Sequence, residues 1–345
     1  SALVQGLSGG EDVISTMLCL RAMGVSIDPT GAPGSYTVTG QGPQLTEPSD
    51  ILDAGNSGTS MRLLSGILAS QPFVSVITGD DSLRSRPMQR IVQPLKQMGA
   101  NIMGRQEDSL APLVVRGGGL QGIEYDLPMA SAQVKSAIML AGLSAAGNTV
   151  IHQPGLSRDH TERMVLAMGG KIEENGLDLL IHPAKLKAVD ITVPGDISSA
   201  AFWMVAGLCH PDAHILIRGV GLNPSRTGIV DVLLEMGAGD SLQLVDQRIE
   251  GGEPVADILI TSTELHGVEI GGDMIPRMLD EVPILAVAAC FAAGDTVIRD
   301  AAELRVKETD RIATTVEELA RLGANIEPRE DGMIIHGRPA GKGEL

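Results

Sequence analysis

The sequence predicts an α/β fold arranged in two domains, and three observations indicate it. The chain has 345 residues, which is enough for two domains of roughly 150 residues each. Predicted strands alternate with predicted helices along the whole length, as they do in α/β proteins. One helix–strand pattern also recurs five times, so we expect the domains to be assembled from a repeated unit.

The first element of the unit is an amphipathic helix that ends at a glycine and leads into a short strand. The five glycines lie 68 to 86 residues apart: Gly24, Gly99, Gly169, Gly237 and Gly323. We expect each to cap its helix in a left-handed conformation. A second strand follows each copy, at residues 35–40, 112–117, 178–183, 257–262 and 332–337.

A second kind of helix, rich in small and apolar residues, follows four of the five copies. These helices are predicted at residues 55–70, 131–145, 196–209 and 280–293, and each runs into another strand and a polar turn. An orphaned half-unit cannot cover its apolar face. Five helices of one kind and four of the other therefore indicate that sequence is missing at both ends or is supplied by another chain.

The predicted boundary between the domains lies in a turn-rich segment. Val193, Pro194, Gly195 and Asp196 follow a charged stretch that contains a proline. Residues 1–192 form the first predicted domain and residues 193–345 the second.

Composition excludes several classes of function. Aromatic residues make up 2% of the chain, which leaves few platforms for stacking on single-stranded nucleic acid. The net charge of −17 disfavours binding to a polyanion or an anionic membrane. The longest apolar run, residues 282–293, is shorter than the roughly 20 residues of a membrane span. We expect a cytoplasmic protein with buried, reduced thiols at Cys19, Cys209 and Cys290.

Two helix starts are candidate anion sites. Residues 53–62 (DAGNSGTSMR) place hydroxyls and Arg62 at one start, and residues 131–135 (SAQVK) occupy the equivalent place in the next unit. Free N–H groups and the helix dipole favour an anion there. An ordinary capped helix start is the alternative for either segment alone.

Arginines gather in the neighbouring turns. Arg84, Arg86 and Arg90 lie near one helix start, and Arg158 occupies the matching turn of the next unit. The planar fork of arginine suits phosphate and carboxylate groups. The alternative is a solvated rim in which each arginine pairs with nearby acids.

Two charged segments are candidates for acid–base chemistry. In RVKETDR, residues 305–311, a continuous helix would place Lys307 and Arg311 on one face with Glu308 beside them. Asp280 and Glu281 open an otherwise apolar helix. The competing interpretations are a surface ion-pair network for the first segment and a favourable dipole or capping interaction for the second.

Metal chemistry is not indicated by the sequence. A predicted turn separates Cys209 and His210 from His214, which begins a strand. Asp159, His160 and Glu162 lie in a turn whose equivalents lack histidine, so we expect them to cap a helix and form ion pairs.

Eight motifs, taken in order, closely resemble the 5-enolpyruvylshikimate-3-phosphate synthase family over essentially the whole chain: GNSGTSMR, RSRPMQRIVQPL, PMASAQVKSAIMLAGL, SRDHTE, PGDISSAAF, NPSRTG, MLDEVPILAVAA and ELRVKETDR. The resemblance implies transfer of the enolpyruvyl group of phosphoenolpyruvate to the 5-hydroxyl of shikimate 3-phosphate, with release of phosphate and without a metal or organic cofactor. It implies the two-domain enolpyruvyl transferase fold, an inverse α/β barrel of βαβαββ units that closes over a cleft. The complete protein is expected to be a monomer.

The resemblance also implies a role for individual residues. The shikimate 3-phosphate contacts would be Ser131, Ala132, Gln133, Arg158, Asp280 and Lys307. The phosphoenolpyruvate contacts would be Gly58, Arg86, Gln133 and Arg311. Asp280 would help to activate the 5-hydroxyl while Glu308 protonates the methylene carbon. Gly58 leaves room beside the phosphoenolpyruvate pocket, which implies sensitivity to glyphosate.

The family's opening PGDKSISHR-type motif and closing DHR-type motif are absent from this sequence. Three interpretations therefore stand at this point. The chain is a synthase completed by further segments, or a fragment that serves as a binding or complementation scaffold, or the sister enzyme that acts on UDP-N-acetylglucosamine. That sister enzyme carries a reactive cysteine in a mobile loop, and no cysteine here lies in a Gly/Arg-rich loop.

Overall fold

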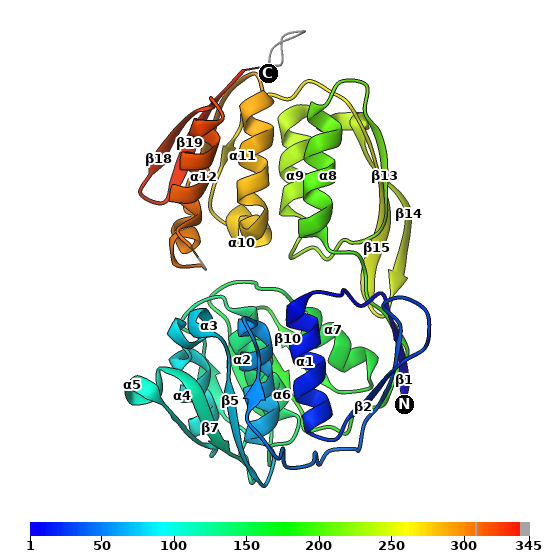
Figure 1. The fold of residues 1–345 in the computed structure, drawn as a ribbon, viewed down its shortest axis with the longest axis vertical. Coiled ribbons are helices and arrows are strands. Elements are labelled where there is room, and N and C mark those ends of the chain that lie inside the picture. The colour runs from blue at the N-terminus through cyan, green and yellow to red at the C-terminus, as the bar shows by residue number, and fades with distance from the viewer. Residues whose placement is uncertain (308, 339–345) are drawn as a thin grey trace. The chain divides into compact units, whose positions relative to one another are not determined.

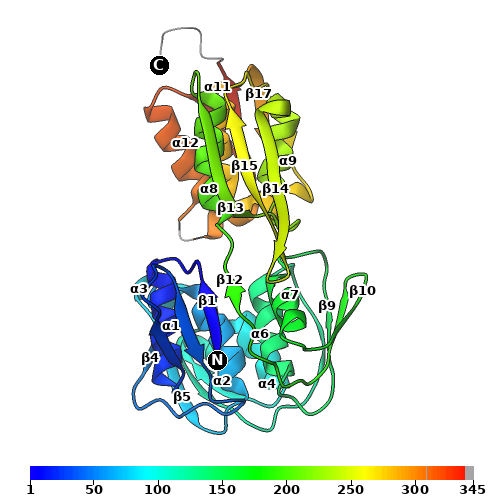
Figure 2. The ribbon, with the colours of Figure 1, turned by 90° about the vertical axis from the view of Figure 1, so that its right-hand side faces the viewer.

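The computed structural model describes residues 1–307 and 309–338, and the chain divides into two compact units, Ser1–Val193 and Pro194–Leu345. Each unit has its own hydrophobic core of Leu, Ile, Val, Ala and Met side chains. Figures 1 and 2 show that helices and sheets alternate along the chain in both units.

The first unit contains three four-stranded sheets, ordered β12–β1–β3–β2, β4–β5–β7–β6 and β10–β11–β9–β8. Their strands are β1 (Ala2–Gln5), β2 (Ser26–Pro29), β3 (Tyr36–Thr39), β4 (Leu52–Asp53), β5 (Val74–Thr78), β6 (Asn101–Gly104), β7 (Leu110–Arg116), β8 (Glu124–Asp126), β9 (Thr149–His152), β10 (Ile172–Asn175), β11 (Asp178–Ile181) and β12 (Ile191–Thr192).

All three sheets share one pairing pattern. The short strand at one edge of each sheet runs parallel to its neighbour in the sheet, as β4 does to β5 and β8 to β9. The remaining neighbours are antiparallel. A helix crosses over between the parallel strands, as such a connection requires. In the first sheet the parallel neighbour of β1 is β12, from the far end of the unit, which pairs Val4 with Ile191.

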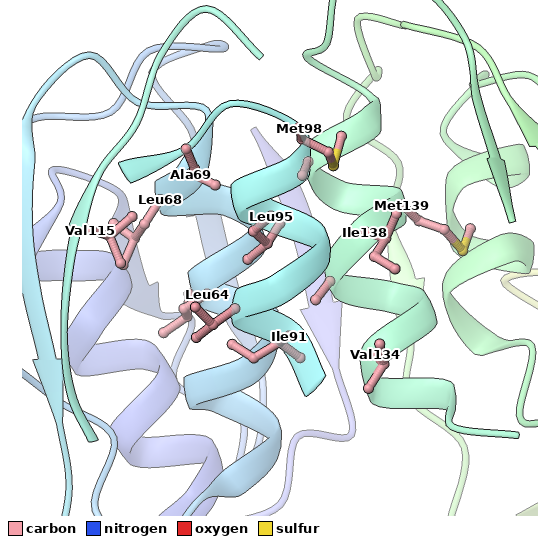
Figure 3. Close-up of a cluster of buried hydrophobic side chains, with 14 of the residues drawn as sticks. Leu64, Leu68, Ala69, Ile91, Leu95, Met98, Val115, Val134, Ile138 and Met139 are labelled. Atoms are coloured by element: carbon pink, nitrogen blue, oxygen red, sulfur yellow. The ribbon is translucent and has the colours of Figure 1, made fainter. Parts of the chain in front are cut away.

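Helices of the first unit pack together and carry its core. They are α1 (Glu11–Ala22), α2 (Gly58–Ala69), α3 (Asp81–Ser85), α4 (Gln89–Gln97), α5 (Arg105–Asp108), α6 (Ala132–Gly142) and α7 (His160–Ala167). Figure 3 shows Leu64 of α2, Ile91 of α4 and Ile138 of α6 among the clustered buried side chains. The backbones of α2 and α6 approach closely, because a Cβ atom at Gly66 would lie 2.3 Å from the carbonyl oxygen of Ala137.

Over its described residues, the second unit has one four-stranded sheet of the same pattern, with β16 parallel to β17, and one three-stranded antiparallel sheet. Its sheets are ordered β13–β15–β14 and β16–β17–β19–β18. Their strands are β13 (His214–Gly221), β14 (Leu242–Glu250), β15 (Glu253–Thr261), β16 (Glu269–Ile270), β17 (Gly294–Ile298), β18 (Asn325–Arg329) and β19 (Gly332–Gly337). Its helices are α8 (Ile197–Cys209), α9 (Gly228–Leu233), α10 (Met274–Met278), α11 (Val282–Phe291) and α12 (Arg311–Arg321), with short helical turns η1 (Leu234–Ala238), η2 (Gly239–Ser241), η3 (Leu279–Glu281) and η4 (Ala302–Val306).

The predicted α/β class and the repeated elements are confirmed. All five predicted capping glycines have positive φ, from 81° to 107°. The four small-residue helices form as α2, α6, α8 and α11. The prediction for the thiols is wrong in part: Cys19 is buried, whereas Cys209 and Cys290 are half-buried because they lie at the ends of α8 and α11.

The described part of the chain lacks two kinds of feature. No helix there is long and apolar enough to cross a membrane. No group of three or more His, Cys, Asp or Glu side chains there is arranged to hold a metal ion, and this includes the segment around Cys209, His210 and His214.

Candidate active site

The starts of α2 and α6 lie side by side and are joined by hydrogen bonds. Ser57 caps α2 by accepting the Ser60 N–H at 3.2 Å, and Ser131 caps α6 by accepting the Val134 N–H. Arg62 Nη1 donates to Gln133 Oε1 at 2.6 Å. Gln133 Nε2 in turn donates to Thr59 Oγ1 at 2.7 Å. The two predicted anion-binding helix starts are therefore neighbours.

Gly58 and Arg86 belong to the same cluster. A Cβ atom at Gly58 would lie 2.8 Å from Arg62 Nη1, so the Arg62 guanidinium would have to shift, and 3.5 Å from Arg86 Nη1, which is ordinary van der Waals contact. Arg86 Nη2 donates to Asn56 Oδ1 at 2.6 Å and to Ser82 Oγ at 3.2 Å. The structure thus brings together Gly58, Arg86 and Gln133, with Arg62 between them.

The electrostatics of this cluster favour an anion. Burial lowers the pKa of Arg62, and the like charges of Arg86 and Arg90 lower it further. Asp80 belongs to the same network, and its side chain accepts from Asn56 Nδ2 and from the Leu83 N–H. Several cations that meet at two helix N-termini make a site that an anion would neutralise.

The segment around Arg158 is tied to α6 from inside the first unit. Arg158 is half-buried in the coil just before α7. Directly after it, Thr161 and Ser136 share a hydrogen bond of 2.6 Å between their hydroxyls. Glu162 forms a buried ion pair with Lys135 of α6, with 2.6 Å between Oε1 and Nζ. Ser131, Ala132 and Arg158 therefore lie on two segments that are fixed to each other.

For Asp159 and Glu162 the expected ion pairs are confirmed, whereas the expected side-chain cap at Asp159 is wrong. Asp159 occupies the cap position of α7 without a side-chain capping bond and pairs instead with Arg163 at 2.9 Å. Glu162 is enclosed in the core beside Lys135. Burial raises the pKa of Glu162, and the charge of Lys135 opposes that shift.

In the second unit, Asp280 and Arg311 form an ion pair. Arg311 Nη1 lies 3.1 Å from Asp280 Oδ1, and the two residues come from η3 and from the first position of α12. Glu281 holds the cap position of α11 without a side-chain capping bond, so the prediction of a side-chain cap is wrong for Glu281. Its carboxylate does lie at the helix start, where the dipole favours it. The carboxylates of Asp280 and Glu281 both turn to arginines of other segments.

The RVKETDR segment does not form one continuous helix. Asp310 caps α12 by accepting the Ala313 N–H at 3.0 Å, so that helix begins only at Arg311. Lys307 lies in an extended conformation after η4 and its Nζ is 3.3 Å from Glu303 Oε1. The prediction that Lys307 and Arg311 share a helix face is therefore wrong. Glu308 lies outside the described residues.

A sequence model of the EPSP synthase (3-phosphoshikimate 1-carboxyvinyltransferase) family matches residues 2–344. The chain belongs to this family. A Brevibacillus brevis protein named 3-phosphoshikimate 1-carboxyvinyltransferase is 54% identical over 337 residues, which are 97% of this chain and 78% of that protein. A protein of the same name from Citrifermentans bemidjiense is 55% identical over 99% of this chain and 79% of its own length.

Solved structures of the family share the fold. EPSP synthase from Acinetobacter baumannii superposes with a TM-score of 0.89 and 47% sequence identity, over 99% of this chain and 77% of that one. The family model matches nearly the whole chain, and the chain spans 77–79% of the length of these relatives.

The sequence did not reveal several residues around these sites. Asn56 and Asp80, which hold Arg86, carried no signal beyond their places in polar turns. Ser198 and Arg226 meet Glu281, which the sequence did single out, although the three lie far apart in the sequence. The available signal was the place of Ser198 at a helix start of the repeat and of Arg226 in a polar turn of the repeat.

Proposed function

We propose that this EPSP synthase family member transfers the enolpyruvyl group of phosphoenolpyruvate to the 5-hydroxyl of shikimate 3-phosphate and releases phosphate. The observation that carries the proposal is the cationic cluster at the joined starts of α2 and α6, where Arg62 contacts Gln133 and lies beside Gly58 and Arg86. Forked guanidinium groups and helix N-termini suit the phosphate and carboxylate groups of these two substrates.

The proposal assigns contacts in each unit. Phosphoenolpyruvate would be bound by Gly58, Arg86, Gln133 and Arg311. Shikimate 3-phosphate would be bound by Ser131, Ala132, Gln133, Arg158, Asp280 and Lys307. Ala132 offers no side-chain hydroxyl, so the Ser131 hydroxyl and the backbone at the start of α6 would supply the neutral donors there.

The proposed reaction has an addition step and an elimination step. Asp280 accepts the proton of the 5-hydroxyl while the hydroxyl oxygen bonds to C2 of phosphoenolpyruvate. Glu308 delivers a proton to the C3 methylene. The resulting tetrahedral intermediate then loses phosphate from C2 and a proton from C3, which leaves the enol ether. Arginines placed at the reacting anion would stabilise the charge that develops on the phosphate.

Phosphate release in the presence of both substrates tests the activity. Glu308→Gln is expected to lower kcat by about two to four orders of magnitude because it removes the proton donor, while the dissociation constant for shikimate 3-phosphate stays near that of the wild type. Glu317→Gln is the matched control, since Glu317 is an exposed glutamate that pairs with Arg321 on α12. Normal turnover by Glu308→Gln would refute the assignment.

A second assay separates catalysis from binding alone. Phosphate release is measured with this chain by itself and with added peptides that carry the PGDKSISHR-type and DHR-type motifs. Binding of shikimate 3-phosphate without phosphate release under either condition would favour the scaffold interpretation and overturn the proposed activity. We also propose a monomeric, cytoplasmic protein, and sedimentation of the purified chain tests the first of these.

A further inference from the structure

A second buried charged cluster lies at the starts of α8 and α11 and has no role in the scheme above. Glu281 is 1% exposed, and its Oε1 atom accepts a hydrogen bond from the Ser198 hydroxyl. Arg226 Nη2 lies 3.4 Å from the same oxygen and donates to Ser198 Oγ at 2.6 Å. Three segments of the second unit thus converge on one carboxylate oxygen.

This cluster is poorly arranged for stability alone. Burying a carboxylate and a guanidinium costs free energy that only complete hydrogen bonding offsets. Within the part of the chain that the structure describes, Glu281 Oε2 and Arg226 Nε are buried without a hydrogen-bond partner. A well-packed apolar trio would fill the same space without that cost, so a positional requirement accounts for the charges better than a stabilising one.

The position of Glu281 indicates what is being held. Glu281 directly follows Asp280 in η3, and the two carboxylates are bound by different arginines. Glu281 is anchored inward to Ser198 of α8 and to Arg226 before α9. Asp280 is paired with Arg311 at the start of α12. Because the residues are consecutive, anchoring Glu281 fixes the backbone from which Asp280 projects.

We propose that Glu281, held by Ser198 and Arg226, is a positioning residue that fixes the Asp280 carboxylate for its contact with the 5-hydroxyl of shikimate 3-phosphate. The inference rests on the proposed function and deepens it. Glu281 itself touches no substrate in this scheme and acts through Asp280. A displacement of a reacting group by about 1 Å can cost a hundredfold in rate.

The first test compares three single variants. Glu281→Gln keeps the size of the side chain but alters its charge and hydrogen bonding, and it is expected to lower kcat/KM for shikimate 3-phosphate by roughly 10- to 100-fold. Ser198→Ala removes one anchor and is expected to act in the same direction with a smaller loss. Asp257→Asn is the matched control, because Asp257 is a partly buried carboxylate of the same unit that pairs with Arg248. It is expected to keep kcat/KM within about twofold of the wild type.

The decisive test is a double-mutant cycle with Asp280→Asn, read out by both phosphate release and shikimate 3-phosphate affinity. If Glu281 acts through Asp280, Glu281→Gln costs little more once Asp280 is replaced. Additive losses, or wild-type kinetics for both Glu281→Gln and Ser198→Ala, would overturn the inference. If Glu281→Gln does not fold, Ser198→Ala takes its place in the cycle. A wild-type protein that releases no phosphate would instead refute the proposed function.

Discussion

Among the individual residues, Lys135 and Glu162 form an ion pair unlike those on the surface. Their side chains are 2% and 3% exposed, whereas the pair of Lys171 and Glu173 is more than half exposed on both sides. Glu162 Oε2 also has no hydrogen-bond partner within the described residues. The pair links α6 to α7 across the core of the first unit, so either charge alone would be stranded away from water.

Replacing Lys135 by Met is therefore expected to lower the free energy of unfolding by about 3–5 kcal/mol, because it leaves a buried charge uncompensated. The double variant Lys135→Met/Glu162→Met is expected to recover most of this loss. Urea unfolding followed by circular dichroism measures both effects. Lys171→Met serves as the control and should change stability by less than about 1 kcal/mol. If Lys135→Met and Lys171→Met lowered the free energy of unfolding equally, breaking the buried pair would cost no more than breaking an exposed one.

His152 is the residue through which pH should act most clearly on the folded state. Its Nδ1 lies 2.7 Å from Asp178 Oδ1 and its Nε2 lies 3.0 Å from Glu124 Oε1. These two carboxylates, Asp178 first, raise the pKa of His152 from 6.5 to about 9. In the second unit, Asp295 likewise raises the pKa of His336.

A raised folded-state pKa stabilises the fold while the histidine is protonated. The contribution of His152 should be fully present below about pH 6.5 and should be lost as the pH rises through about 9. His152→Gln is expected to remove this part of the pH dependence of the urea midpoint between pH 6 and pH 10. His214→Gln, on an exposed strand residue, should keep the wild-type profile. An NMR titration that places the His152 pKa near 6.5 would contradict the mechanism.

At the scale of elements, helices α2 and α6 of the first unit approach each other closely. The position of Gly66 against the Ala137 carbonyl lets the two helices pack backbone to backbone. The same packing places Arg62, one turn into α2, within reach of Gln133 in the first turn of α6. The contact between Arg62 and Gln133 in the cationic cluster thus depends on Gly66, which has no side chain to hold the helices apart.

Gly66→Ala is expected to force α2 and α6 apart and to cost about 1–3 kcal/mol in unfolding free energy, as overpacking does. We also expect the KM for phosphoenolpyruvate to rise, because the contact between Arg62 and Gln133 lengthens. Gly40→Ala is the control, since an added Cβ there meets nothing within 4 Å. Unchanged KM together with lowered stability would separate the packing of the helices from the geometry of the site.

Elements were predicted from the sequence where a local signal determines them. The glycine caps at Gly24 and Gly323 depend on left-handed φ values that few other residues adopt, and both are confirmed. The RVKETDR segment shows where local reasoning stopped: helical spacing linked Lys307 to Arg311, but the capping bond of Asp310 starts the helix later. Contacts such as Arg226 with Glu281 required the fold, because no sequence period relates residues 55 positions apart.

For the whole molecule, the important contrast is between its overall charge and its cationic cluster. The chain carries 43 acidic and 26 basic residues, yet Arg62, Arg86 and Arg90 lie close enough together to affect one another. The overall field repels the proposed anionic substrates, and the local field attracts them. Added salt should screen the solvent-exposed charges and so weaken both the overall repulsion and the local attraction.

Raising the ionic strength from roughly 0.1 M to 1 M, which shortens the Debye length from about 10 Å to about 3 Å, is expected to increase the KM for phosphoenolpyruvate several-fold. Steady-state kinetics at several KCl concentrations measure how steeply the KM for phosphoenolpyruvate rises with salt. Arg86→Gln should flatten the salt dependence, while Arg321→Gln, which alters an exposed pair on α12, should leave it unchanged. A KM that does not respond to salt would mean that charge attraction contributes little to binding.

The parallel pairing of β1 with β12 has a consequence for how the first unit is made. Leu3 N–H donates to Asp190, Val4 pairs with Ile191, and Val193 N–H donates to the Gln5 carbonyl, so the two ends of the unit are laced together. During translation, a strand present among the first five residues has to wait until residue 193 leaves the ribosome before its sheet is complete. The pairing of β1 with β12 joins segments that are far apart in the sequence, and its second strand is synthesised last. We therefore expect formation of this pairing to be the slow step in folding of the first unit.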